Sequence, residues 1–180
     1  IEYKHNRNRK GFIMVEALFH RRSIRKYKNE LIREEEIEKL LKAAMAAPSA
    51  GNQQPWEFII IKDRNIMLEI TRFHSYSQML KEARLAIVVC GDPQRERHSG
   101  YWVQDCAAAT ENILIEAQYL KIGSVWLGVY PEEDRVRNMR KLLNIPDHII
   151  PFSIISLGYP AETKSPSDRF DVQRIHINKW

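Results

Sequence analysis

The chain has little cysteine: Cys90 and Cys106 are the only two among 180 residues, and no Cys/His spacing suits zinc. Cys90 falls in an apolar run typical of a strand and Cys106 inside a helical pattern, so we expect both to be buried small hydrophobic residues. The six histidines are scattered, and no Ser-His-Asp set or pair of carboxylates stands out. We therefore expect no metal ion and no catalytic side chain. A reducing, cytoplasmic setting is the simplest interpretation.

Long apolar runs are absent too, since no segment approaches the roughly 18 apolar residues that a membrane-spanning helix needs. The charged N-terminus is not followed by an apolar core of about seven residues or more, which argues against a signal peptide. The chain also lacks a G-x-G-x-x-G turn and strict βαβ punctuation. The expected class is therefore α+β and not a Rossmann domain.

The net charge of +5 comes mostly from the N-terminus, because Lys4, Arg7, Arg9 and Lys10 lie there and the excess nearly vanishes beyond Ile13. Residues 1–13 show no apolar period, so we expect a disordered segment or a remnant of cloning, with a genuine basic extension as the alternative. We expect residues 14–180 to form a single domain. A chain of this length with 44% hydrophobic residues can bury a substantial core.

Apolar periodicity predicts a mixture of helices and buried strands over this domain. Val15, Leu18 and Phe19 predict a short helix that leads into the Arg21 motif. A second predicted helix begins with the acidic turn 34–36 and is ended by Pro48, and a third is capped by Asn65 and ends at Phe73. The last two are predicted over 101–121 and from Pro131 to Leu143. The predicted strands are 58–61, which we expect to be buried on both faces, 85–90, which we also expect to be buried, 124–129 and 152–157. Gly123 is a plausible C-cap of the long helix.

The helix expected over 101–121 is apolar on most sides. One stripe holds Trp102, Cys106, Ala109, Ile113, Ala117 and Leu120, and an adjoining stripe holds Val103, Ala107, Thr110 and Leu114. One small domain does not easily cover two stripes. The polar tail is weakly strand-like over 172–177 and finishes on Trp180, which suggests that the tail docks on another surface.

Three arginines and a serine crowd into five positions at Arg21, Arg22, Ser23 and Arg25. Guanidinium groups match phosphate oxygens bidentately and a hydroxyl adds a further hydrogen bond, so this cluster suits a phosphate. The alternative is a charged helix C-terminus, where basic side chains satisfy the last carbonyls. Both interpretations can hold at once.

A second motif, Ala47-Pro48-Ser49-Ala50-Gly51-Asn52-Gln53-Gln54-Pro55-Trp56, is a turn-rich loop that runs straight into an apolar strand. Such a loop can place backbone N–H and C=O groups against a flat polar ring. The alternative is a simple connection between helix and strand. Together with the arginine cluster, the loop predicts a site for a phosphorylated heterocycle.

These motifs, with Trp126-Leu127-Gly128-Val129-Tyr130-Pro131 further on, closely resemble the nitroreductase family of FMN-dependent oxidoreductases, from about Val15 to the C-terminus. The resemblance implies a central, mostly antiparallel sheet flanked by helices, in an intertwined homodimer with a C-terminal extension. It also implies that FMN is bound by Arg21, Arg22, Ser23, Arg25, Pro48, Ser49, Ala50, Asn52, Gln53, Trp126, Leu127, Gly128 and Arg169. The loop residues would come from the partner subunit, and backbone near Gly128 would face the reactive N5 atom of the flavin.

The activity that the resemblance implies is reduction of flat, electron-poor acceptors such as nitroaromatics and quinones by NADH or NADPH, in a ping-pong cycle. The flavin would carry out the redox chemistry while the protein supplies binding and orientation. Reductive dehalogenation and flavin fragmentation are alternatives within the family. A non-catalytic basic protein that binds nucleic acid is a distant alternative, because it would need exposed aromatics interleaved with basic residues. We expect a homodimer with a small-molecule acceptor as its partner, and no nucleic acid or membrane.

Overall fold

A computed structural model of the chain describes residues 16–180. The prediction of a separate segment at 1–13, and the place of Val15 in the first helix, lie outside these residues. Residues 16–20 are helical. The helices that follow are α2 (Glu34–Met45), α3 (Arg64–Phe73), α4 (Trp102–Tyr119) and α5 (Glu133–Leu143). The strands are β1 (Trp56–Ile61), β2 (Leu85–Gly91), β3 (Gly123–Gly128) and β4 (Ile150–Gly158). Short 3₁₀ turns cover Ala50–Asn52, Ser75–Lys81, Pro93–Arg95 and Val172–Arg174.

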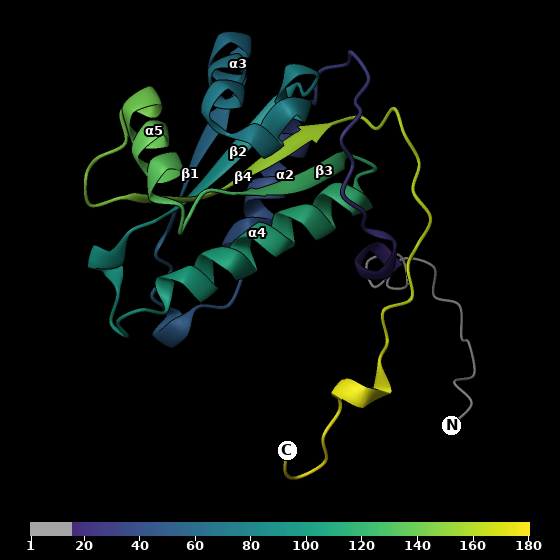
Figure 1. Cartoon of the computed structure of the whole chain (residues 1–180), viewed down its shortest axis with the longest axis vertical. Helices are drawn as coiled ribbons and strands as arrows, with labels where there is room; N and C mark the ends of the chain where they lie inside the picture. Colours follow the sequence, from purple (N-terminus) through teal and green to yellow (C-terminus); the bar gives the residue numbers. More distant parts are fainter. Residues whose placement is uncertain (1–15) are drawn as a thin grey trace.

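The four strands form one antiparallel sheet in the order β1-β2-β4-β3 (Figure 1). Since β2 and β4 are central, their backbones are paired on both sides and nearly all their residues are buried. This arrangement confirms the predicted α+β class and the predicted antiparallel sheet. It also confirms that Cys90 is a buried residue within a strand.

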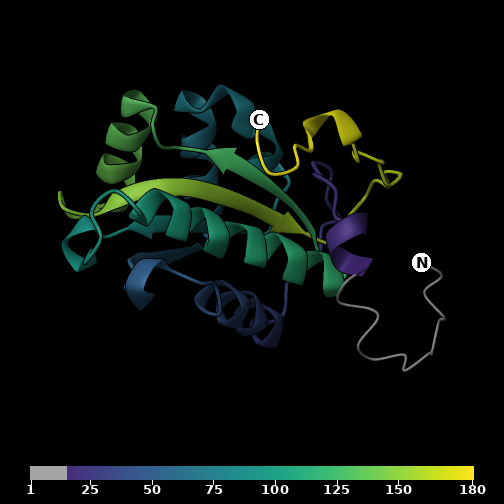
Figure 2. The same ribbon diagram turned by 90° about the horizontal axis from the view of Figure 1, so that it is seen from below.

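Helices cover both faces of the sheet: α2 and α4 lie on one side, and α3 and α5 on the other (Figure 2). Side chains alternate along β2, so that Leu85, Ile87 and Val89 pack toward α4 while Ala86 and Val88 pack toward α3 and α5. Each fully buried Leu, Ile or Val side chain stabilises the fold by about 1.5–3 kcal/mol. The sheet is therefore a rigid support for the segments at its edges.

The strand predicted over 58–61 differs from the prediction in two respects. It begins earlier, at Trp56, and it lies at the edge of the sheet, where Ile60 is 40% exposed. The prediction that it is buried on both faces is wrong, because among residues 16–180 β2 is its only neighbour in the sheet and helices cover it incompletely. The apolar run predicts that a strand forms but not where the strand lies in the sheet.

Two predicted caps are also wrong. The N-cap of α3 is Asp63, whose carboxylate accepts a hydrogen bond from the backbone N–H of Asn65 at 2.7 Å. After α4 the left-handed residue is Lys121 (φ 62°), and the N–H of Ile122 bonds to the carbonyl of Ala117 at 2.8 Å. This pattern is a Schellman motif, which places Gly123 at the first position of β3 and not at the helix end.

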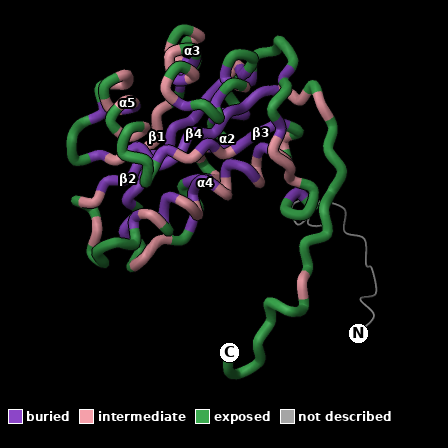
Figure 3. Tube along the Cα trace, in the orientation of Figure 1, coloured by how far each residue is buried: buried purple, intermediate pink, exposed green. Residues whose placement is uncertain are grey.

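The two stripes of α4 differ in part in burial. Trp102, Cys106, Ala109, Ile113 and Ala117 of the first stripe are buried. In the second stripe Thr110 and Leu114 are buried too, whereas Val103 and Ala107 are half-buried (Figure 3). The first helix is more exposed than its pattern predicts, because Leu18 is 51% and Phe19 64% exposed while Ala17 is buried. Apolar surface therefore remains open along one side of this chain.

The tail beyond Pro160 leaves the body of the molecule and is exposed along most of its length (Figures 1 and 3). The weak strand prediction over 172–177 is wrong, since Val172–Arg174 forms a 3₁₀ turn. Phe170, Val172, Ile175, Ile177 and Trp180 are all more than half exposed. Among the described residues, none of the helices combines the length and apolar character that a bilayer span requires.

Candidate functional site

The arginine cluster follows helix 16–20 and runs beside the start of β3. The backbone N–H of Ile24 donates to the carbonyl of Ser124 at 2.9 Å, and Ser23 pairs with Ser124 in a parallel bridge. The Ile24 side chain is buried against the sheet, and a Cβ on Gly123 would lie 2.7 Å from it. Gly123 thus allows a close approach that holds the cluster at the sheet edge.

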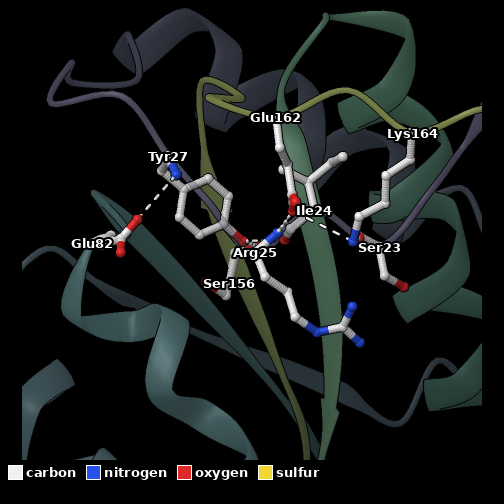
Figure 4. A network of polar contacts seen from close by, with 8 residues as sticks. All are labelled: Ser23, Ile24, Arg25, Tyr27, Glu82, Ser156, Glu162 and Lys164. Carbon is white, nitrogen blue, oxygen red and sulfur yellow. Dashed lines mark hydrogen bonds and ion pairs between the residues drawn. The ribbon is translucent and has the colours of Figure 1, made fainter.

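A second segment, 159–167, pairs with the cluster on its other side (Figure 4). The Glu162 carboxylate accepts a hydrogen bond from the Arg25 backbone N–H at 2.6 Å, and Lys164 Nζ donates to the Ser23 carbonyl at 2.6 Å. The Arg25 N–H bond, together with Lys164, lowers the pKa of Glu162. Ala161 N–H donates to the Lys26 carbonyl at 2.9 Å. The beginning of the C-terminal tail therefore orders the backbone of the arginine cluster.

The arginines of the cluster have different partners. Arg22 donates to the carbonyls of Ser165 at 3.0 Å and Ser167 at 3.4 Å, so its guanidinium fastens the tail. Arg21 pairs with Glu111 of α4 at 3.3 Å. The Arg25 guanidinium has no hydrogen bond or ion pair within residues 16–180, and in Figure 4 it extends away from the other labelled side chains. Of the three, Arg25 is the one whose charge is free for a ligand.

Arg169 lies further along the tail, where its Nε donates to the Ser167 hydroxyl at 3.2 Å. Arg169 is exposed. The bond from Arg22 to the tail fixes the point at which the tail leaves the body of the molecule. Its predicted contact with a phosphate stays a prediction.

The second motif is a loop whose polar groups are tied down from within. The Ser49 hydroxyl accepts from the Gln54 N–H at 3.0 Å. Asp105 of α4 accepts from the Ala50 N–H at 3.0 Å and from Gln53 Nε2 at 2.7 Å. The Gln53 side chain is 7% exposed, and its oxygen accepts from two backbone N–H groups at 97 and 98. Gln53 therefore shapes the loop from inside.

The same loop has an unusual backbone. Gly51, Asn52 and Gln54 all have positive φ, at 53°, 55° and 48°. A left-handed conformation costs a residue other than glycine roughly 1–2 kcal/mol, and asparagine tolerates it better than most. A Cβ on Gly51 would also lie 2.7 Å from the His98 ring. Strain of this kind persists where the surroundings hold it, and it often marks a ligand-binding segment.

Asp105 is a residue of this site to which the sequence analysis assigns no role. It is 4% exposed and lies in the first turn of α4, where a helix dipole favours negative charge. Two of its bonds go to the loop. The signal was available in the sequence, since an acidic residue inside an apolar helical stripe needs a buried donor.

The end of β3 is the third part of the site. Leu127 points into the core toward α3 and α5, whereas Trp126 packs on Phe152 on the α4 side with ring centroids 5.8 Å apart. A Cβ on Gly128 would meet nothing within 4 Å. The Gly128 carbonyl accepts from His74 Nε2 at 2.9 Å and from Arg135 Nη1 at 3.0 Å. Open space beside a strand edge is what a flat ligand would need.

One chain brings only part of the predicted site together. The arginine cluster and the tail meet at the start of β3, and β3 leads from there to Gly128. The Pro48–Gln53 loop lies near the opposite end of α4 from helix 16–20, in both views (Figures 1 and 2). The loop and the cluster therefore do not face each other within one chain. Contact of any of these residues with a ligand stays a prediction.

Comparison with known proteins begins with families: a sequence profile of the nitroreductase family matches residues 18–84 and 67–159. A protein of Archaeoglobus fulgidus, provisionally named an NADH dehydrogenase/NAD(P)H nitroreductase, is 52% identical over 170 residues. The matched region covers 92% of this chain and 98% of that relative.

Solved structures resemble the whole fold. A provisionally named NADH oxidase from Clostridium acetobutylicum has a TM-score of 0.88 and 51% identity, over 91% of this chain and 99% of the other. An FMN-dependent nitroreductase from Clostridium difficile has a TM-score of 0.86 and 31% identity, over 92% and 99%. The sheet, its flanking helices and the β3 edge thus belong to a shared architecture.

Proposed function

Because the chain belongs to the nitroreductase family, we propose that it is an FMN-dependent oxidoreductase that uses NADH or NADPH to reduce flat, electron-poor acceptors. Nitroaromatics and quinones are the acceptor classes. The observation that carries the proposal is the pairing of a free arginine with an open strand edge, connected by β3. The name of the Clostridium difficile relative supports FMN as the cofactor.

The residues present fit FMN at both ends of β3. At one end, the Arg25 guanidinium and the Ser23 hydroxyl have no partner within residues 16–180, so both can serve a phosphate. At the other end, the space beside Gly128 leaves room for a ring at the backbone. When bound, FMN supplies the ability to accept a hydride from the nicotinamide and to pass electrons to the acceptor.

In this proposal the side chains around the β3 edge bind and orient the flavin ring and shield the edge from water. Trp126, Phe152, Trp102 and Tyr130 form a chain of edge-to-face aromatic contacts with centroids 4.9–6.2 Å apart. These four aromatic side chains lie on the α4 side of β3 and form an apolar surface next to the proposed ring position. It also anchors the turn that follows Gly128, so the strand edge keeps its shape.

The active unit in this proposal is a homodimer, in which the Pro48–Gln53 loop of one protomer meets the arginine cluster of the other. The separation of loop and cluster along α4 supports this arrangement. So does the apolar surface left open on one chain at Phe19, Ile177 and Trp180. Exposed apolar patches usually mark interfaces, and a two-fold interface would create two equivalent sites.

The proposal is tested by titrating the purified protein with FMN and with riboflavin. We expect tight binding of FMN with one molecule per chain, and weaker binding of riboflavin, which lacks the phosphate. A protein that binds neither would refute the proposed cofactor. Protein that purifies yellow should release one FMN per chain when denatured.

Arg25→Ala should weaken FMN binding about tenfold or more, because a hydrogen bond to a charged group contributes roughly 1.5–3 kcal/mol. Riboflavin affinity should be nearly unchanged. Lys28→Ala, an exposed basic neighbour three residues on, is the matched control and should affect neither ligand. Equal losses for FMN and riboflavin would show that Arg25 does not contact the phosphate.

A further inference from the structure

The carbonyl of Gly128 is held by two donors that come from different helical segments. His74, at the end of α3, donates from Nε2 at 2.9 Å, and Arg135 of α5 donates from Nη1 at 3.0 Å. His74 is 1% exposed, and Arg135 also lies over the Tyr76 ring at 5.8 Å. Neither side chain belongs to the motifs that carry the proposed function.

The hydrogen bonds define the protonation of His74. A carbonyl can only accept, so the proton must be on Nε2. The other ring nitrogen, Nδ1, is buried and has no partner within residues 16–180. Burial lowers the pKa of His74 and outweighs the opposing effect of the hydrogen bond to Gly128, and the Arg135 charge acts in the same direction as burial. His74 is therefore a neutral donor dedicated to one carbonyl.

The strand geometry shows in which direction the Gly128 carbonyl points. In a strand the N–H and C=O of one residue point to the same side, and the side alternates along the chain. The Ser124 carbonyl bonds outward to Ile24, and the Gly128 carbonyl bonds outward to His74 and Arg135. Residues 124, 126 and 128 thus direct their backbone groups away from β4, toward the free edge.

We propose that His74 and Arg135 are positioning residues that occupy the Gly128 carbonyl, so that Gly128 offers the flavin ring its N–H donor and no free acceptor. The inference rests on the proposed function. Oxidised flavin accepts hydrogen bonds at N5, whereas reduced flavin carries a proton there and donates. A donor at Gly128 favours the oxidised form, and a released Gly128 carbonyl would favour the reduced form.

The first test needs no cofactor. Nitrogen-15 spectra of histidine-labelled apoprotein at pH 7 should show His74 protonated at Nε2 and bare at Nδ1, with His74→Gln used to assign the signal. The opposite tautomer would overturn the inference, because Nε2 could then not donate to Gly128. This result stands or falls separately from FMN binding.

The second test is the midpoint potential of the bound flavin. His74→Leu combined with Arg135→Met should favour reduced over oxidised FMN about tenfold, which raises a two-electron potential by about 30 mV. The single variant His74→Gln keeps an N–H donor, so its midpoint potential should equal that of the wild type. Arg137→Met is the control, since in the described part of the chain Arg137 pairs only with Asp134, on the same exposed face.

An unchanged or lower potential in a double variant that still binds FMN would overturn the inference, and so would equal shifts in His74→Gln and His74→Leu. Should the double variant fail to fold, Arg135→Met alone should raise the potential by a smaller amount, and no rise there would also overturn it. A wild-type protein that binds no FMN would instead refute the proposed function, while leaving the tautomer test in force.

Discussion

Removing residues 165–180 should leave a monomer that no longer holds FMN. The tail carries apolar side chains that are largely exposed, including Phe170, Ile177 and Trp180, and these would cover the partner subunit. The deletion also removes the carbonyls of Ser165 and Ser167, which fasten Arg22 beside the cluster. Dimer stability and FMN affinity should therefore be lost together, although the Pro48–Gln53 loop is untouched.

Light scattering and the flavin absorbance of the same sample check this expectation. Arg22→Met is the matched variant, because it releases the tail near the cluster but keeps all apolar side chains of the tail. It should remain a dimer with FMN affinity reduced about tenfold, because the released tail orders the arginine cluster less well. A tenfold loss corresponds to about one hydrogen bond from a charged group. A truncated monomer that still binds FMN and turns over would contradict the shared site.

Asp105→Ala should cost about 3 kcal/mol of folding stability, because the Ala50 N–H and the buried Gln53 amide each lose an acceptor at about 1–3 kcal/mol. The loop holds three residues at positive φ, and without these bonds it should relax to other conformations. FMN affinity should then fall roughly a hundredfold, since the ordering of the loop adds about 3 kcal/mol to the binding cost.

Thermal unfolding and FMN titration of the same variant separate the two effects. Asp105→Asn keeps one oxygen acceptor and should lie between Ala and wild type in both measurements. Gln104→Ala, the exposed neighbour on the same helical turn, should change neither. Wild-type FMN affinity in a stably folded Asp105→Ala protein would show that the loop does not contact the cofactor.

The sequence predicts well those features that depend on local pattern. The run from Leu85 to Cys90 predicts a buried strand because every residue is apolar, and it forms β2, one of the two central strands. The long helix is equally clear, because its apolar residues recur over five turns. In both cases burial on several sides leaves little choice of conformation.

Features that depend on tertiary neighbours could not be predicted in the same way. The exposure of Ile60 follows from the place of β1 at the sheet edge, and an apolar run does not contain that information. Likewise, the left-handed residue after α4 is Lys121 and not Gly123. Gly123 instead lies against Ile24, where a Cβ would come within 2.7 Å of that side chain, and only the folded chain creates this contact.

The candidate site divides in the same manner. The arginine cluster and the loop are visible as motifs, because their residue types are unusual at that density. The different partners of Arg21, Arg22 and Arg25 cannot be predicted from the motif. They depend on Glu111 and on the carbonyls of a tail more than 140 positions away in sequence. His74 gives no sequence signal at all as a partner of Gly128.

The most direct test of the central claim is rapid mixing of the FMN-loaded protein with NADH or NADPH under anaerobic conditions. The account predicts that the flavin absorbance bleaches without any acceptor present, and that a quinone or nitroaromatic added afterwards restores it. Steady-state rates should give parallel double-reciprocal lines, as expected when both substrates use one pocket in turn. A flavin that stays oxidised until the acceptor is also present, or one that neither nicotinamide reduces, would contradict it.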